Sequence, residues 1–101
     1  MKLIIITAVQ EFEKQIKKIL FKSNTKVFSY MPITGYKDIS LDTYKENWFG
    51  GDMPESESVV FMAFVPEENV DVLYDNFKEF NDNDKFSSRI HVATVNLERS
   101  I

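Results

Sequence analysis

Cysteine is absent from the 101 residues of this chain, and histidine occurs only once, as His91. Without cysteine there are no disulfide bonds, no thiol catalysis and no cysteine-ligated zinc or iron–sulfur sites. A single histidine also excludes a histidine-rich metal site built from one chain. We therefore expect no metal centre of these kinds.

Basic residues are in the minority. The chain has 12 lysines and arginines against 16 aspartates and glutamates, which gives a formal net charge of −4. Affinity for nucleic acid comes mostly from contacts between basic side chains and phosphates. We therefore expect no nucleic-acid partner.

Long hydrophobic runs are missing as well. The two apolar runs, residues 3–9 and 59–65, are far shorter than the roughly 20 residues that cross a bilayer as a helix. The first run is followed directly by Gln10-Glu11-Phe12-Glu13 rather than by a small-residue cleavage site, so we interpret it as a strand and not as a secretory signal. We expect no membrane insertion and a cytoplasmic location.

Strand and helix patterns alternate along the chain. Residues 3–9 and 59–65 are continuously apolar, which is typical of central strands, whereas residues 25–33 and 89–95 are mixed in polarity, as edge strands are. Two segments between them carry apolar residues at helical spacing. These residues are Phe12, Ile16, Ile19 and Leu20 in the first segment, and Val70, Leu73, Tyr74, Phe77 and Phe80 in the second.

The element order predicts an α+β fold in one domain, residues 1–101. It is the β-α-β-β-α-β order of the ferredoxin-like sandwich, with a four-stranded antiparallel sheet of order 4-1-3-2. Right-handed crossovers place both helices on one face of the sheet. Residues 34–58 show no sustained period, so we expect a long loop between the second and third strands.

The two central strands are apolar on both faces, yet the helices cover only one face. We predict that the uncovered face carries Ile4, Ile6, Val60, Met62 and Phe64, and that the covered face carries Leu3, Ile5, Val9, Val59, Phe61 and Val65. Leaving such side chains in water forfeits about 1.5–3 kcal/mol each. We therefore expect other copies of the chain to cover this face.

The loop at residues 34–58 is acidic and aromatic. It holds two lysines against six carboxylates, and its aromatic residues are Tyr36, Tyr44, Trp48 and Phe49. Tyrosine and tryptophan are frequent anchors of protein interfaces, so docking on a partner and packing on the domain itself are both open interpretations. The spacing of Asp38, Asp42 and Glu46 fits either a divalent-cation site or a solvated helix.

Four segments together resemble the PII-type signal-transduction proteins, the nitrogen regulatory PII superfamily, and their PII-like relatives. The segments are MKLIIITAV, KVFSYMPITGY, SVVFMAFVPEENVDVLYDNF and RIHVATVNLE, in this order and with the long loop between the second and third. The resemblance covers nearly the whole chain. It implies a regulatory trimer whose sheets face inward, ligand pockets between subunits, and a T-loop at residues 34–58 that docks on a membrane transporter or an enzyme.

The resemblance also implies ligand-binding residues, with departures from the classical pattern. The implied residues are Gly35, Lys37, Lys85, Ser87, Ser88 and Arg89. The segment 84–89 has none of the glycines through which backbone amides approach phosphates closely. This chain is therefore similar to a divergent PII-like member that lacks the classical ATP-site glycines, and a nucleotide (ATP, ADP or a cyclic nucleotide) is one candidate ligand.

No arrangement of residues typical of a catalytic site is present, so we do not expect an enzyme. The alternative is a small dimeric α+β-barrel enzyme, either a cofactor-free monooxygenase or a haem-degrading enzyme, with its pocket on the uncovered face. Asn47, Trp48 or His91 would then line that pocket. His91 is otherwise a structural residue, or one of three copies around a threefold axis that together bind a metal.

Overall fold

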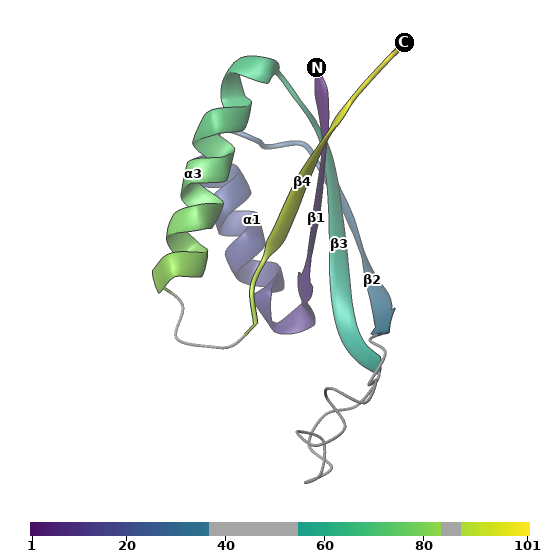
Figure 1. Cartoon of the computed structure of the whole chain (residues 1–101), viewed down its shortest axis with the longest axis vertical. Helices are drawn as coiled ribbons and strands as arrows, with labels where there is room; N and C mark the ends of the chain where they lie inside the picture. Colours follow the sequence, from purple (N-terminus) through teal and green to yellow (C-terminus); the bar gives the residue numbers. More distant parts are fainter. Residues whose placement is uncertain (37–54, 84–87) are drawn as a thin grey trace, which may run out of the picture.

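A computed structural model describes residues 1–36, 55–83 and 88–101 of the chain. In order, the elements are strand β1 (Lys2–Val9), a short 3₁₀ helix η1 (Gln10–Phe12), helix α1 (Glu13–Lys22), strands β2 (Ser29–Tyr36) and β3 (Glu55–Val65), helix α3 (Glu67–Asn83) and strand β4 (His91–Asn96) (Figure 1). The predicted α+β class and the β-α-β-β-α-β order are confirmed.

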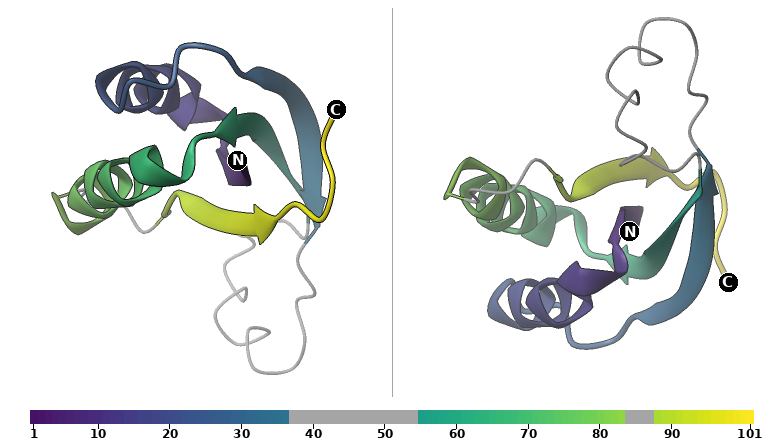
Figure 2. Two further views of the ribbon diagram at one scale, coloured as in Figure 1. Left: turned by 90° about the horizontal axis from the view of Figure 1, so that it is seen from above. Right: turned by 90° about the horizontal axis from the view of Figure 1, so that it is seen from below.

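The four strands form one antiparallel sheet of order β2-β3-β1-β4, which is the predicted order seen from the other edge. Helices α1 and α3 lie side by side on one face of this sheet (Figure 2). Pro32 lies in the edge strand β2, where its missing N–H leaves no gap in the sheet interior. The ferredoxin-like architecture is therefore confirmed.

The prediction of which side chains share a face is wrong for β1. Lys2 pairs with Val65 and Ile6 pairs with Phe61, so every even-numbered residue of β1 lies opposite an odd-numbered residue of β3. The buried face therefore carries Ile4, Ile6, Val59, Phe61 and Val65, whereas the uncovered face carries Leu3, Ile5, Val60, Met62 and Phe64. A strand that is apolar on both faces does not reveal its register, and a shift of one residue exchanges its faces.

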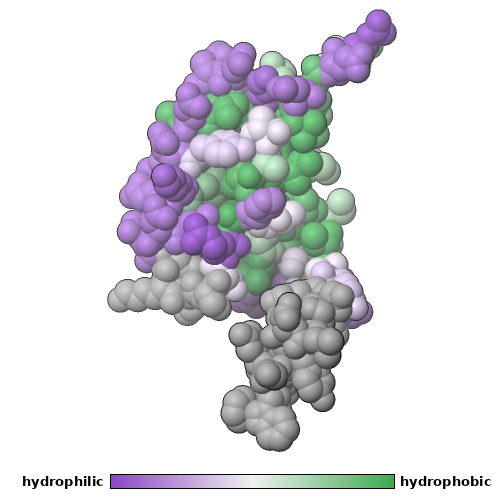
Figure 3. Space-filling model, in the orientation of Figure 1, coloured by the Kyte–Doolittle hydropathy of each residue, from purple (hydrophilic) through white to green (hydrophobic). Residues whose placement is uncertain are grey.

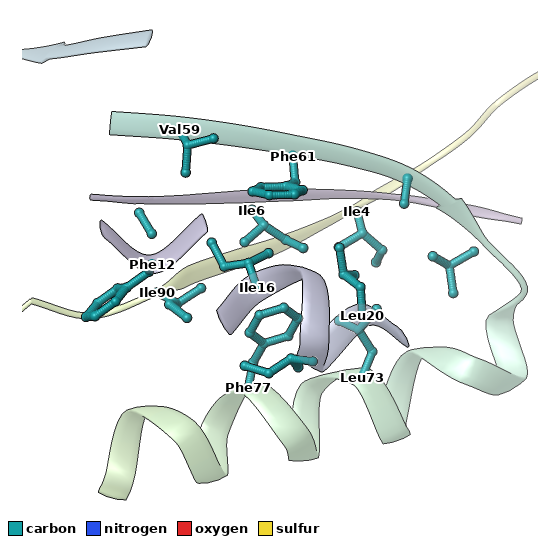
Figure 4. Close-up of a cluster of buried hydrophobic side chains, with 14 residues drawn as sticks. Ile4, Ile6, Phe12, Ile16, Leu20, Val59, Phe61, Leu73, Phe77 and Ile90 are labelled. Atoms are coloured by element: carbon teal, nitrogen blue, oxygen red, sulfur yellow. The ribbon is translucent and has the colours of Figure 1, made fainter. Parts of the chain in front are cut away.

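The core lies between the covered face of the sheet and the two helices (Figure 4). Ile16 and Leu20 of α1 and Leu73 and Phe77 of α3 meet the sheet there. Phe12 packs edge to face on Phe80, with ring centroids 5.3 Å apart. The predicted apolar positions of the first helix are all buried, and those of the second are buried or half-buried except Tyr74, whose hydroxyl is bonded to Thr94 at 2.6 Å.

Helix α1 ends in a Schellman turn. Asn24 adopts the left-handed conformation with φ 61°. Thr25 donates its N–H to Leu20 O at 2.8 Å, and Asn24 donates to Phe21 O at 3.0 Å. Because residue 25 belongs to this turn, β2 begins later than predicted, at Ser29.

The predicted loop at 34–58 is too long at both ends. β2 continues to Tyr36 and β3 begins at Glu55, and Gly35 is paired with Ser56 across the ladder. The segment from Glu55 to Ser58 contains no apolar residue, so sequence periodicity gives no sign of a strand there. Within the described residues, no helix is long and apolar enough to cross a membrane.

Candidate functional site

Gly35 lies near the end of β2, where it is opposite Ser56 of β3. A Cβ atom at this position would lie 3.0 Å from Ser58 Oγ and 3.2 Å from Ser56 Oγ. The two serine hydroxyls are 3.3 Å apart and share a hydrogen bond. Glycine is therefore used here for the close approach of two hydroxyl groups, and its backbone is not in the left-handed region.

The strand β2 is attached to α1 by Lys17. Its Nζ donates hydrogen bonds to Tyr30 Oη at 2.9 Å and to Glu13 Oε2 at 3.2 Å, and lies 4.2 Å from the centre of the Tyr30 ring. The ring of Tyr30 in turn stacks on Phe61, with centroids 5.0 Å apart. The hydrogen bonds to Tyr30 and then to Glu13 raise the pKa of Lys17 above its usual 10.5, because they favour the charged ammonium group.

A second group of candidate residues lies where β4 begins. Asn81 of α3 donates from Nδ2 to Ile90 O and accepts from Ile90 N–H, both at 2.9 Å. This pair holds the chain beside Ser88 and Arg89 against the end of α3. Ser88 is half-buried and Arg89 is exposed.

A hollow of about 330 Å³ runs between α3 and β4 at this point, and two of its lining residues, Lys78 and Arg89, are basic. It is lined by Tyr74, Phe77, Lys78, Asn81, Arg89, Ile90, His91 and Val92. Lys78 and Arg89 give the hollow the chemistry of an anion site. Lys78 was missed in the sequence, although it is the only basic residue of α3 and could have been singled out for that reason.

A single chain does not bring Gly35 close to Ser88 and Arg89. Gly35 and Arg89 lie at the same end of the sheet but on its opposite edges, with β3 and β1 between them. Three strand spacings separate them by about 14 Å. The other predicted site residues, which are Lys37, Tyr44, Trp48, Phe49, Lys85 and Ser87, lie outside the described residues, as do Asp38, Asp42, Glu46 and Asn47.

The uncovered face of the sheet is apolar and solvent-exposed. Hydrophilic residues gather over α3, whereas hydrophobic residues dominate the side of the sheet (Figure 3). Phe64 is 60% exposed and Met31 is 50% exposed. His91 lies on this face opposite Thr7 and is exposed, rather than in the core. Among the described residues, no group of three or more histidine and acidic side chains could hold a metal ion.

Comparisons with known proteins identify the fold. No family model and no curated protein sequence matches the chain. Solved structures do match. One is CPII, a nitrogen regulatory PII-like protein from Thiomonas intermedia K12, bound to ADP, AMP and bicarbonate; it has a TM-score of 0.62 and 19% identity, over 99% of this chain and 94% of that one. The fold is that of the PII-like proteins.

Two further structures support the PII-like fold. CPII bound to ADP and bicarbonate matches with a TM-score of 0.61 and 18% identity, over 97% of this chain and 88% of that one. The periplasmic divalent cation tolerance protein CutA from Archaeoglobus fulgidus matches with a TM-score of 0.63 and 14% identity, over 100% of this chain and 88% of that one. At such identities the likeness concerns the fold, and the resemblance noted in the sequence is confirmed at that level.

Proposed function

We propose that this chain is a trimeric PII-like regulatory protein rather than an enzyme. It binds a small ligand between subunits and docks on a partner protein through the long loop between β2 and β3. The observation that carries the proposal is the apolar, helix-free face of a sheet with the PII-like fold. A cytoplasmic location is part of this proposal.

The uncovered face supports self-association. Leu3, Ile5, Val60, Met62 and Phe64 lie in two adjacent central strands and are half-buried or exposed. Complete burial of a side chain of this size contributes about 1.5–3 kcal/mol, so each half-exposed one still offers about 1 kcal/mol. Facing sheets in a closed assembly would gain this energy from every subunit at once.

The ligand site follows from the same assembly. A ring of identical subunits brings one edge of each sheet next to the opposite edge of its neighbour. Gly35 at the β2 edge of one subunit and Arg89 at the β4 edge of the next would then face one cleft, with Ser88 and Lys78 beside Arg89. The basic residues favour an anionic ligand, and the ADP, AMP and bicarbonate bound by CPII are the first candidates.

A binding screen tests the ligand. Thermal unfolding is followed with ADP, ATP, AMP, cyclic nucleotides, bicarbonate and divalent cations in turn. We expect at least one anionic ligand to raise the midpoint, and Arg89→Gln to abolish that shift while Lys14→Gln, an exposed change on α1, preserves it. A stabilising ligand that acts equally on the Arg89 variant would contradict the site, and no shift with any compound would contradict ligand sensing.

The segment proposed to dock, the long loop between β2 and β3, contains an intrinsic fluorescent reporter. Trp48 is the only tryptophan of the chain and belongs to the segment proposed to dock. A bound ligand that signals through this segment should change the emission of Trp48, as an order–disorder switch would. Unchanged emission on saturation with a ligand that binds would contradict this mechanism.

The proposed partner is a membrane transporter or an enzyme. The anchors are Tyr36, which is 71% exposed at the end of β2, with Tyr44, Trp48 and Phe49. A variant with alanine at these four positions should lose the partner in a pull-down and keep its ligand. Retention of the partner by that variant would contradict docking through this segment.

A further inference from the structure

The outer surface of the two helices carries two stripes of opposite charge. Exposed lysines follow one another at one-turn spacing on α1, and exposed carboxylates do the same on α3. The basic stripe consists of Lys14, Lys18 and Lys22, and the acidic stripe consists of Asp71, Asp75, Glu79 and Asp82. Each stripe lies on the side of its helix opposite the buried residues, so both stripes face away from the sheet.

Each stripe belongs to a segment of nearly uniform sign. Residues 14–27 contain five lysines and no aspartate or glutamate, whereas α3 contains six carboxylates and one lysine. In the described part of the chain, the ion pairs are Lys2 with Glu67 at 3.9 Å and Lys17 with Glu13 at 3.2 Å. Neither pair includes a member of a stripe, so the chain does not neutralise the stripes itself.

The placement of the stripes restricts the kind of partner that fits them. Helices α1 and α3 lie side by side on one face of the sheet (Figure 2), and the axes of packed helices are about 8–10 Å apart. A uniformly anionic surface, such as a membrane, would therefore meet the carboxylates of α3 as soon as it approached the lysines of α1. A complementary surface must carry a basic stripe beside an acidic one.

A second copy of this chain carries such a surface. The strands β1 and β3 are antiparallel, and each is followed by one of the helices, so α1 and α3 are antiparallel as well. A two-fold axis parallel to the helices would place α1 of each copy over α3 of the other. This rotation produces no shift along the helices, so every residue of α1 keeps the level that it has beside its own α3.

These levels bring opposite charges together. Two contacts between the helical segments define them, namely the hydrogen bond of 2.9 Å between Asn76 and Ser23 and the packing of Phe12 on Phe80. In the pair, Lys22 of one copy would lie at the level of Asp75 of the other. The N-terminal end of the basic stripe would lie at the level of Glu79 and Asp82.

We propose that the helical layer of one copy pairs with that of a second copy, with the basic stripe of each on the acidic stripe of the other. This inference goes beyond the proposed function, because it uses the helices and leaves the uncovered face of the sheet to the trimer. Phe21, which is 66% exposed beside the lysines, adds apolar area to the contact. Exposed ion pairs contribute little each, so the pairing is weak and depends on salt and protein concentration.

Charge reversal tests the pairing. One variant carries Lys14→Glu, Lys18→Glu and Lys22→Glu, and the other carries Asp71→Lys, Asp75→Lys and Glu79→Lys. Each variant has two stripes of the same sign and should not pair with itself. In an equimolar mixture, the acidic α1 of the first variant meets the basic α3 of the second, and the other two helices match as well, so pairing should return.

The measurement is molar mass by light scattering at increasing protein concentration. It is made in about 20 mM salt and in about 1 M salt, where the Debye length falls to about 3 Å and the ion pairs are screened. In low salt, we expect the wild type and the mixture to reach at least about twice their high-salt mass, and each variant alone to keep its high-salt mass. The matched control carries Glu11→Lys, Glu57→Lys and Glu98→Lys, which change the net charge as much as the second variant does, and it should associate as the wild type does.

Three results would overturn the pairing. They are a wild-type mass that is equal in both salts, variants that associate alone as the wild type does, and a mixture of two folded variants that does not associate. Co-sedimentation of the wild type with vesicles containing anionic phospholipid, lost in the lysine variant and without a rise in mass, would assign the basic stripe to a membrane and overturn the pairing too.

The high-salt mass separates this inference from the proposed function. Three chains in high salt without a rise in low salt would remove the pairing and leave the trimer. One chain in high salt with a rise in low salt would remove the trimer and leave the pairing.

Discussion

Asn81 and Ile90 are joined by two hydrogen bonds, in which the amide side chain at the end of α3 pairs with both backbone groups of the residue before β4. The side chain of Asn81 thereby replaces a strand partner for Ile90. This contact fixes the chain next to Arg89, the residue on which the proposed anion site depends.

Two substitutions of Asn81 should distinguish the contributions of its two hydrogen bonds to stability. Asn81→Ala should lower the free energy of unfolding by about 1–2 kcal/mol, because both backbone groups of Ile90 lose their partner. Asn81→Asp keeps an acceptor for the N–H but has no donor for the carbonyl, so we expect a loss of about 1 kcal/mol. Urea unfolding measures both, with the exposed Asn83→Ala as the matched control. A loss no larger than that of the control would contradict the role of Asn81.

Gly35 should tolerate a methyl group once the serine hydroxyls are removed. In Gly35→Ala alone, the new methyl group would lie too close to Ser58 Oγ and Ser56 Oγ, so we expect little change or a small loss of stability. In a Ser58→Ala, Ser56→Ala background the same substitution should stabilise the protein by about 0.4–1 kcal/mol, because alanine has fewer unfolded conformations to lose. Thermal or urea unfolding of the four variants forms the cycle, and an equal effect in both backgrounds would contradict the close-approach account.

Lys17 should stabilise the fold in a pH-dependent manner. Its pKa is higher in the folded chain than the usual 10.5. The stabilising contribution is therefore complete below 10.5 and is lost as the pH rises through the higher, folded-state pKa. The difference in unfolding free energy between the wild type and Lys17→Met should be constant at neutral pH and shrink in strongly alkaline solution. Lys18→Met, an exposed change on the same helix, is the matched control. A Lys17 difference that grows above 10.5 would reverse the sign predicted here.

The uncovered face should not accept a charge. Val60 lies on this face opposite Thr7 and is half-buried, so Val60→Glu should place an unpaired carboxylate between subunits. An unpaired buried charge costs several kcal/mol, and we expect the assembly to dissociate into single folded chains. Val72→Glu is the matched control, because Val72 is 49% exposed on α3. An unchanged molar mass for Val60→Glu, measured by light scattering, would contradict an interface on this face.

Most of the fold is readable from the sequence because its signals are local. The spacing of Phe12, Ile16 and Leu20 determines which side of α1 is buried, and the polarity of each strand places it at the centre or the edge of the sheet. The side chains of β1 could not be assigned to the covered or uncovered face from the sequence, because the register depends on how two distant strands pair. The pairing of Gly35 with Ser56 was missed because the segment from Glu55 to Ser58 contains no apolar residue.

The candidate site was only partly predictable. Arg89 is a candidate because of a family resemblance, whereas Lys78 and Asn81, which line the same hollow, belong to a helix and approach it only through tertiary packing. No local pattern connects residues 78 and 89. The proposed cleft that joins Gly35 and Arg89 could not be derived from such local patterns either, because it requires a second chain.

The molar mass of the wild-type protein in solution, measured by light scattering across a range of concentrations, tests the central claim most directly. The chain has a mass of 11.8 kDa, and we predict three times this value, about 35 kDa, for the assembly. A stable particle of 11.8 kDa would contradict the account, since the apolar face would then remain in water. A particle of two chains would contradict the trimer and favour the dimeric barrel enzymes.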